Sequence, residues 1–121
     1  MKAIIDTDVL IDYLQGVPEA KEEIDQYSQP LYSIISWMEI MCGAETREEQ
    51  SDADVLFRSL IKIDLTPEIA QRAVVERKAS GLKLPDAVIL ATADCEGCIL
   101  VTRNTKDFDA EEPRVRIPYT V

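Results

Sequence analysis

The chain has no histidine, and its 121 residues include only 3 cysteines, 4 glycines and 6 prolines. So little glycine and proline excludes collagen-like and low-complexity proteins. Three cysteines do not build a disulfide scaffold, and an odd number favours a reducing compartment. No uncharged run approaches the about 20 residues that a membrane-spanning helix needs. Asp6 also interrupts the first apolar stretch before a signal-peptide core can form. We therefore expect a cytoplasmic protein with no membrane partner.

The composition is that of an ordinary globular domain, with 46% hydrophobic and 30% charged residues. A chain of this length buries roughly two-thirds of its unfolded surface on folding. It therefore needs no disulfide or metal to complete its core, and we expect one domain spanning residues 1–121.

Negative charge dominates, but it is unevenly distributed. The formal net charge is -10. Residues 1–54 contain 13 acidic and 3 basic residues, whereas residues 55–121 contain 10 of each. A phosphate backbone could be held by the basic residues of the second half, although solvated surface charge is the more ordinary explanation for any one of them.

Apolar periodicity predicts short strands separated by helices. The expected strands cover residues 3–5, 31–35, 61–65, 98–102 and 115–117, and the expected helices include 8–14, 18–27, 67–80 and 86–94. Ser36 is expected to open one helix and Ser51 to cap another. Gly81 is a strong helix stop. Because parallel neighbours need crossover connections, this alternation favours an α/β fold in which helices cover both faces of a parallel sheet.

Acidic and amide side chains follow several predicted strands. Asp6 comes directly after the first strand, Glu39 soon after the second, and Asn104 and Asp107 after the fourth, while Asp86 begins a helix. All can meet beyond the carboxyl ends of the strands, where open α/β sheets bind their ligands.

Clustered carboxylates repel one another unless they hold protons, move apart or bind a cation. Because the chain has neither histidine nor a cysteine cluster, the cation expected at such a site is Mg²⁺ or Mn²⁺, bound by oxygen ligands. The corresponding reaction is metal-assisted hydrolysis of a phosphodiester. Each residue also has a purely structural interpretation: Asp6 and Asp8 could cap a helix, Ser36-X-X-Glu39 matches a capping box, Asp86 suits a helix N-terminus, and Asn104 and Asp107 suit a turn.

Four segments in order resemble the PIN-domain family, and most closely its VapC-type toxin ribonucleases. These segments are residues 5–14 (IDTDVLIDYL), Ser36-X-X-Glu39 with Gly43 downstream, residues 84–93 (LPDAVILATA) and residues 100–108 (LVTRNTKDF). The resemblance implies a PIN-like three-layer α/β/α fold with a central, mostly parallel sheet of four to five strands. It also implies a Mg²⁺- or Mn²⁺-dependent endoribonuclease that a VapB-type antitoxin neutralises and that is commonly a homodimer.

The resemblance further implies residue roles. Asp6 and Asp86 would be the principal metal ligands, and Glu39 would complete the acidic cluster. Asn104 or Asp107 would fill a fourth catalytic position. Bases that flank the cluster would contact the RNA substrate, namely Arg72, Arg77, Lys83 and Arg103.

Other functions remain open at this level. A phosphotransfer receiver domain is also a small, acidic α/β protein, and Asp64 could be its phosphoacceptor, although no convincing strand-end lysine follows. A PIN-fold binding module without turnover is a third possibility. A redox or zinc role for Cys95 and Cys98 fits poorly, because the pair follows a helix and lacks further ligands. Trp37, Met38 and Met41 fit core packing better than a partner-binding stripe.

Overall fold

Five short strands form one all-parallel sheet at the centre of the computed structural model, which describes residues 1–120. The strand order is β3-β2-β1-β4-β5. Their bounds are β1 (Lys2–Ile5), β2 (Gln29–Ser33), β3 (Ile61–Ile63), β4 (Ile99–Val101) and β5 (Val115–Arg116). The predicted α/β class and parallel sheet are therefore confirmed, and the sheet is wholly rather than mostly parallel.

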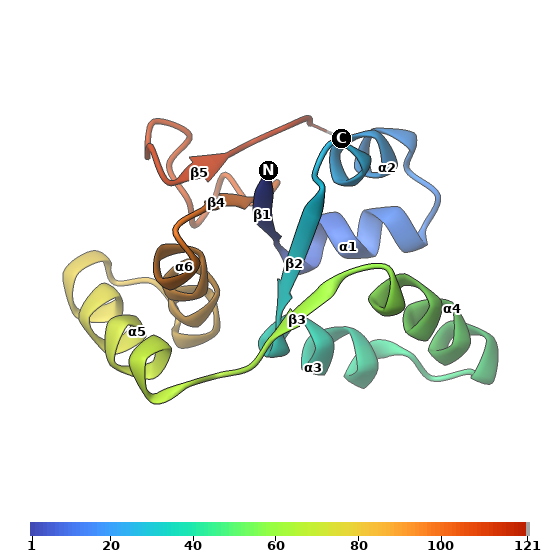
Figure 1. Cartoon of the computed structure of the whole chain (residues 1–121), viewed down its shortest axis with the longest axis horizontal. Coiled ribbons are helices and arrows are strands. Elements are labelled where there is room, and N and C mark those ends of the chain that lie inside the picture. The colour runs from blue at the N-terminus through green and yellow to red at the C-terminus, as the bar shows by residue number, and fades with distance from the viewer. Residues whose placement is uncertain (121) are drawn as a thin grey trace.

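Six helices within residues 1–120 surround the sheet (Figure 1). They are α1 (Thr7–Leu14), α2 (Pro18–Asp25), α3 (Ile34–Gly43), α4 (Arg47–Arg58), α5 (Pro67–Ser80) and α6 (Leu84–Glu96). None of the helices formed by residues 1–120 is both long and apolar enough to span a bilayer.

Side chains that alternate along each strand build two separate apolar layers. On β1, Ala3 and Ile5 pack with α1, α2 and α4, whereas Ile4 packs on the opposite face against Ile89 and Leu90 of α6. A third apolar cluster joins α6 to α5, which lies outside it. The result is three layers, with α1, α2 and α4 on one side of the sheet and α6, backed by α5, on the other (Figure 1).

Two predicted helix starts are wrong. The helix after β2 begins at Ile34 with Ser33 as its cap, so Ser36 is an internal, buried residue rather than the first residue of a capping box. The helix expected after Ser51 is capped by Thr46, whose hydroxyl accepts from the Glu49 amide while the Glu49 carboxylate accepts from the Thr46 amide. That reciprocal pairing satisfies two amides that would otherwise lack partners at the helix end.

The predicted helix end at Gly81 is confirmed. Gly81 adopts a left-handed backbone with a φ of 74° and closes α5 through a hydrogen bond from its amide to the Arg77 carbonyl. A residue with a side chain would be strained in this conformation.

Candidate active site

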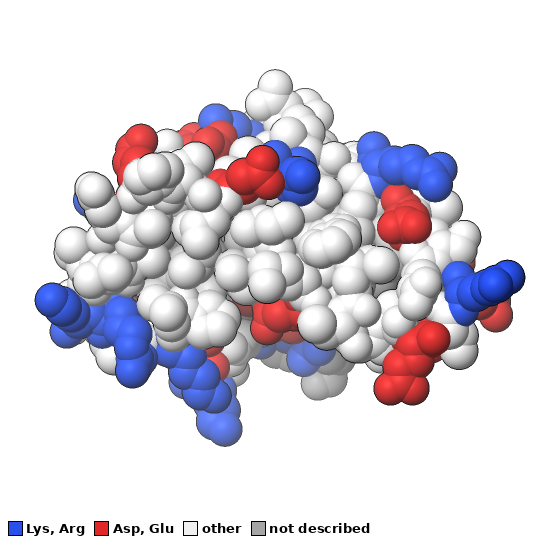
Figure 2. Space-filling view, turned by 90° about the horizontal axis from the view of Figure 1, so that it is seen from below, with Lys and Arg blue, Asp and Glu red and all other residues white. Residues whose placement is uncertain are grey.

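Three neighbouring strands deliver polar residues to the same edge of the sheet. Asp6 follows β1, α3 follows β2 without a break, and Thr102 follows β4. Figure 2 views this edge from below; acidic side chains lie near its middle, and basic side chains gather on the side of α5 and α6. Parallel strands make this convergence unavoidable, because all their carboxyl ends lie on one side.

Asp6 is the most deeply buried acid at this edge, with 4% of its surface exposed. It caps α1 by accepting a hydrogen bond from the Thr7 amide at 2.8 Å, and its other oxygen accepts from the Thr102 hydroxyl at 2.7 Å. Within residues 1–120 no Lys or Arg pairs with it. Burial, and then the charges of Asp8 and Asp86, raise its pKa well above the ordinary value, and the two hydrogen bonds only partly oppose this.

Asp8 also belongs to this edge, although the sequence suggested for it a capping role or, with Asp6, the acidic pair of a receiver domain. Its carboxylate accepts from the Arg103 amide at 3.2 Å and lies 3.4 Å from the Thr102 hydroxyl. Burial raises the pKa of Asp8 despite these donors. The signal for this role was available in its spacing of two residues from Asp6, but the partners are about 95 residues away along the chain.

Glu39 extends from α3 toward the start of α1. Its carboxylate accepts a hydrogen bond from the Thr7 hydroxyl at 2.8 Å, and that hydroxyl lies 2.8 Å from the Ser36 hydroxyl. Glu39 is exposed, whereas Ser36 is fully buried. The structure thus links Glu39 to the residue next to Asp6.

Asp86 lies in the first turn of α6, and two acids face it. Burial, followed by the charges of Asp107 and Glu39, raises the pKa of Asp86, and Lys83 only partly opposes the effect. Asn104 holds Asp107 through reciprocal hydrogen bonds: its amide donates to the Asp107 carboxylate at 2.9 Å, and its carbonyl oxygen accepts from the Asp107 backbone at 3.2 Å. Asp107 therefore brings charge to Asp86, while Asn104 orients Asp107.

The carboxylates at this edge are close enough to affect one another electrostatically, but they do not converge on a single metal-binding position. Among residues 1–120, no group of three or more His, Cys, Asp or Glu side chains is placed so that it could hold a metal ion as it stands. The donor chemistry nevertheless suits a hard cation, because every candidate ligand is an oxygen, and neighbouring acids contribute to the raised pKa of Asp6 and of Asp86.

The four bases considered for RNA contact lie in different surroundings. Arg103 forms a bidentate ion pair with buried Asp12 at 2.6 and 2.9 Å, and the Tyr119 hydroxyl donates to the same carboxylate at 2.8 Å. Arg72 lies 3.5 Å from Asp94, which is near the other end of α6 from the acidic edge. Arg77 donates to the Leu82 carbonyl, and Lys83 is exposed just ahead of Asp86.

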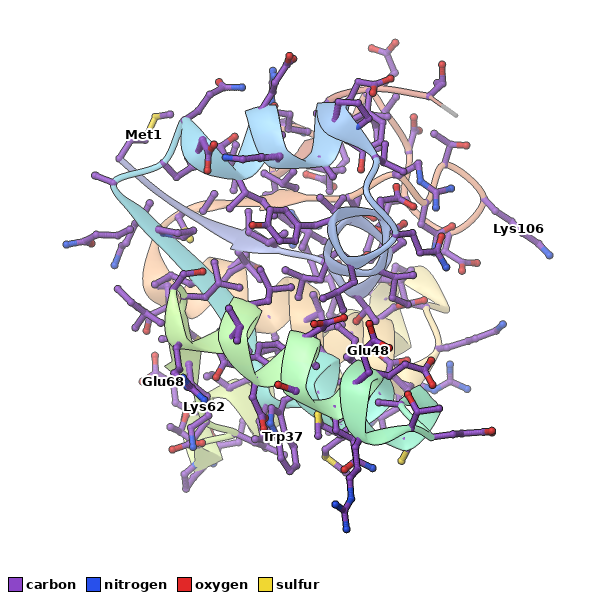
Figure 3. The ribbon with its side chains drawn as sticks, turned by 90° about the vertical axis from the view of Figure 1, so that its right-hand side faces the viewer. Met1, Trp37, Glu48, Lys62, Glu68 and Lys106 are labelled. Carbon is purple, nitrogen blue, oxygen red and sulfur yellow. The ribbon has the colours of Figure 1, made fainter. Side chains whose placement is uncertain are left out.

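An open cleft adjoins Glu39 between α1, α3 and α4. Its volume is about 250 Å³, and it is lined by acidic and apolar residues, among them Ile11, Leu14, Glu39, Ile40, Glu49 and Asp52. Figure 3 looks onto this side of the molecule, where α4 carries exposed acids such as Glu48.

The expectation that Trp37 and Met38 pack in the core is wrong, since 39% and 51% of their surfaces are exposed. Met41 alone of the three packs against the core. Figure 3 shows Trp37 on the outside of the molecule. Because α3 starts at Ile34, its buried face passes through Ser36 and Ile40 and turns Trp37 and Met38 outward.

Cys95 and Cys98 have the properties of inert thiols. Burial is the main cause that raises the pKa of each thiol, whereas a reactive cysteine has a lowered pKa.

Comparison with known protein families matches residues 3–110 to the PIN domain. The chain belongs to the PIN-domain family. This confirms the resemblance seen in the four sequence segments. Comparison with curated proteins finds no match.

Solved structures agree with this PIN domain over nearly its whole length. A chain of a toxin-antitoxin complex from Klebsiella pneumoniae is 41% identical, with a TM-score of 0.91 over 98% of this chain and 99% of that chain. A chain of VapBC2 from Rickettsia felis, bound to a DNA fragment from the promoter, is 18% identical with a TM-score of 0.81 over 96% of each chain. A chain of DNA-bound VapBC from Salmonella typhimurium is 23% identical with a TM-score of 0.78, covering 97% of this chain and 96% of that chain. The last two likenesses concern the fold alone.

The strand order of this PIN domain also removes the receiver alternative. Doubly wound folds of the receiver type have the order 2-1-3-4-5, in which the third strand is central. Here β3 is an edge strand, and Asp64 after it is exposed and lies 3.5 Å from Lys62. Asp64 therefore does not occupy the position that a phosphoacceptor needs.

Proposed function

We propose that this PIN domain is a metal-dependent endoribonuclease of the VapC toxin type, which hydrolyses RNA phosphodiester bonds at the carboxyl edge of its sheet. One observation carries the proposal: Asp6 is buried at the carboxyl edge of the sheet with no Lys or Arg partner among residues 1–120, and Thr7 joins it to Glu39 from the neighbouring strand end. The raised pKa of Asp6 and of Asp86, to which the charges of other acids contribute, agrees with this. Carboxylates whose charge is unfavourable and uncompensated are the expected state of a cation site before the cation binds.

The proposed cofactor is Mg²⁺ or Mn²⁺. Asp6 and Asp86 would hold it, with Glu39 beside them, and Asp107 fits the fourth position better than Asn104 because its charge faces Asp86. The chemistry that such a cation supplies is acidification of water and neutralisation of phosphodiester charge.

The protein's own residues would orient these ligands and bind the substrate. Thr102 and the Thr7 amide fix the two oxygens of Asp6, and Asn104 fixes Asp107. We propose Lys83 and Arg77 as the RNA contacts nearest to Asp86 along the chain. Arg72 and Arg103 are retained as proposed contacts that also make ion pairs within the protein. With a net charge of -10, we expect RNA binding to be weak and salt-sensitive.

We also propose a VapB-type antitoxin as the partner, because a 41% identical relative is described as part of a toxin-antitoxin complex. The cleft beside Glu39 supports this, since its acidic and apolar lining suits a basic amphipathic segment. A peptide seated there would lie against a proposed metal ligand and could block the site.

A homodimer and a cytoplasmic location complete the proposal. The exposed side chains of Trp37 and Met38 supply apolar surface for a second copy. The three free cysteines suit a reducing compartment. Light scattering of wild-type and Trp37→Glu proteins tests the dimer: we expect the substitution to lower the measured mass, and an unchanged dimer would place the interface elsewhere.

Cleavage of total bacterial RNA tests the enzymatic proposal. We expect fragments with Mg²⁺ or Mn²⁺, none with EDTA, and none from the Asp6→Asn variant. Asp64→Asn is the matched control, because Asp64 also follows a strand of the sheet, but that strand is the outermost one, β3, and Asp64 lies 3.5 Å from Lys62. Cleavage that survives both EDTA and Asp6→Asn would refute the proposal, and a wild-type protein that never cleaves RNA would favour a binding module.

A further inference from the structure

Thr7 contacts two of the proposed metal ligands at once. Its backbone amide donates to Asp6 at 2.8 Å, and its side-chain hydroxyl donates to Glu39 at 2.8 Å. Asp6 and Glu39 come from different strand ends and are 33 residues apart in the sequence. Thr7 therefore connects the two carboxylates directly.

The hydroxyl of Ser36 completes this connection, and its hydrogen bond has a defined direction. The Glu39 carboxylate can only accept, so the single hydroxyl hydrogen of Thr7 points to it. The 2.8 Å contact between Thr7 and Ser36 must then use the hydrogen of Ser36. The order of donation is Ser36 to Thr7 to Glu39, a series that we call the hydroxyl relay.

The relay anchors an exposed carboxylate to the buried interior. Ser36 is fully buried, and it lies one helical turn before Glu39 on α3. A free Glu side chain samples many rotamers, and restricting them costs free energy when a ligand binds. A hydrogen bond formed in advance removes part of that cost, as outer partners do for metal ligands in general.

We propose that Thr7 and Ser36 are positioning residues that hold Glu39 in register with Asp6 for divalent-cation binding. The proposal rests on the proposed function, since it assigns these hydroxyls to the same cation site. It adds two uncharged residues to the site: Thr7, which no sequence pattern indicated, and Ser36, whose spacing from Glu39 predicted a helix cap instead.

Calorimetric titration with Mn²⁺ alone tests the relay. Thr7→Val keeps the side-chain shape and the hydrogen bond from the backbone amide to the Asp6 carboxylate, but it removes the hydroxyl. We therefore expect the Mn²⁺ affinity to fall about 10-fold. Thr7→Ser restores the hydroxyl and should restore the affinity. Ser36→Ala should weaken binding less, because Thr7 still donates to Glu39. Thr92→Val is the matched control: the Thr92 hydroxyl is buried too, but it donates to the Val88 carbonyl of its own helix.

A double-mutant cycle separates positioning from a general structural effect. If Thr7 acts through Glu39, Thr7→Val should change the Mn²⁺ affinity of Glu39→Ala, which has no side-chain acceptor, by less than 2-fold. An equal loss in both backgrounds, or failure of Thr7→Ser to restore binding, would overturn the relay. A wild-type protein that binds no Mn²⁺ would overturn the proposed function together with the relay, whereas binding by wild-type and Thr7→Val proteins with equal affinity would overturn the relay alone.

Discussion

Helix α6 carries an acid near each end, and the two acids have opposite electrostatic surroundings. Near its C-terminus, Asp94 accepts from Arg114 at 3.0 Å and lies 3.5 Å from Arg72. The same Arg114 guanidinium pairs with Glu76 and Glu112 at 3.0 and 2.9 Å. Near its N-terminus, Asp86 faces the like charges of Asp107 and Glu39.

The difference shows why a count of acids does not locate an active site. Around Arg114, one guanidinium satisfies three carboxylates, and its hydrogen bonds lower the pKa of Glu112. At the sheet edge, burial raises the pKa of Asp6, Asp8 and Asp86, and the charges of neighbouring acids add to the effect. An acidic cluster whose repulsion nearby bases only partly balance leaves a place for an external cation.

The same substitution at the two ends of α6 should separate their roles most clearly. Asp86→Asn should lower the kcat/KM for RNA cleavage by at least about 100-fold, because it removes a proposed metal ligand. Asp94→Asn should retain activity near that of the wild type. Equal activities of the two variants would mean that the uncompensated end of α6 has no catalytic role.

The Arg114 cluster should matter for stability rather than for cleavage. Arg114→Gln leaves Glu76, Asp94 and Glu112 without their shared partner, and we expect a loss of about 2 kcal/mol in the free energy of unfolding. Arg72→Gln is the control; Arg72 is more exposed and makes one contact at 3.5 Å, so its loss should be below about 0.5 kcal/mol. Urea unfolding measures both. Similar losses would show that the Arg114 network contributes no more than a surface ion pair.

The two asparagine variants should also shift stability in opposite directions. Asp94→Asn weakens the bond to Arg114, and we expect it to lower the free energy of unfolding by about 1 kcal/mol. Asp86→Asn relieves repulsion, so we expect it to raise that free energy by a few tenths of a kcal/mol after the lost helix-end interaction is deducted. Destabilisation by both variants, measured in the same urea titration, would contradict the assignment of Asp86 to a repulsive cluster.

The pH dependence of the free energy of unfolding should also differ between the acids at the sheet edge and those around Arg114. The folded-state pKa of Asp86 is raised, so the stability that it contributes is present below its ordinary value of 3.8 and is lost as the pH rises through the folded value. The folded-state pKa of Glu112 is lowered, so its contribution is present above 4.5 and is lost as the pH falls through the folded value. The stabilisation by Asp86→Asn should therefore grow with pH, and the destabilisation by Glu112→Gln should shrink in acid. Urea unfolding measures the free energy of unfolding of each variant relative to the wild type from acid to neutral pH. If this difference changed in the same direction for Asp86→Asn and Glu112→Gln, the result would contradict the assignment.

Sequence reasoning succeeded where a feature was local. The apolar strands were recognisable from their hydrophobic runs, and parallel topology then brought Asp6 and Asp86 within electrostatic reach of each other. The start of α3 was missed because residues 31–35 form an apolar run that passes from strand into helix with no glycine or proline between them. The error placed Ser36 at a cap and turned Trp37 and Met38 inward.

The contacts that sequence reasoning could not supply join distant segments. Arg103 and Tyr119 reach Asp12 across 91 and 107 residues, so their pairing follows only from the folded chain. The hydroxyl relay was not predicted either: Thr7 matches no pattern, and the spacing of Ser36 from Glu39 suggested a capping box rather than a contact with Thr7. The family resemblance indicated the acidic residues at the sheet edge, and the structure adds the residues that hydrogen-bond to them.

Anomalous diffraction from a crystal soaked in MnCl₂ tests the central claim most directly, because it locates bound Mn²⁺ without relying on turnover. We expect an anomalous peak between the carboxylates of Asp6 and Asp86 in the wild-type protein, and no such peak in Asp6→Asn. A fully soaked wild-type crystal with no peak there, or with its strongest peak at the acids around Arg114, would contradict the claim that the uncompensated edge is the cation site.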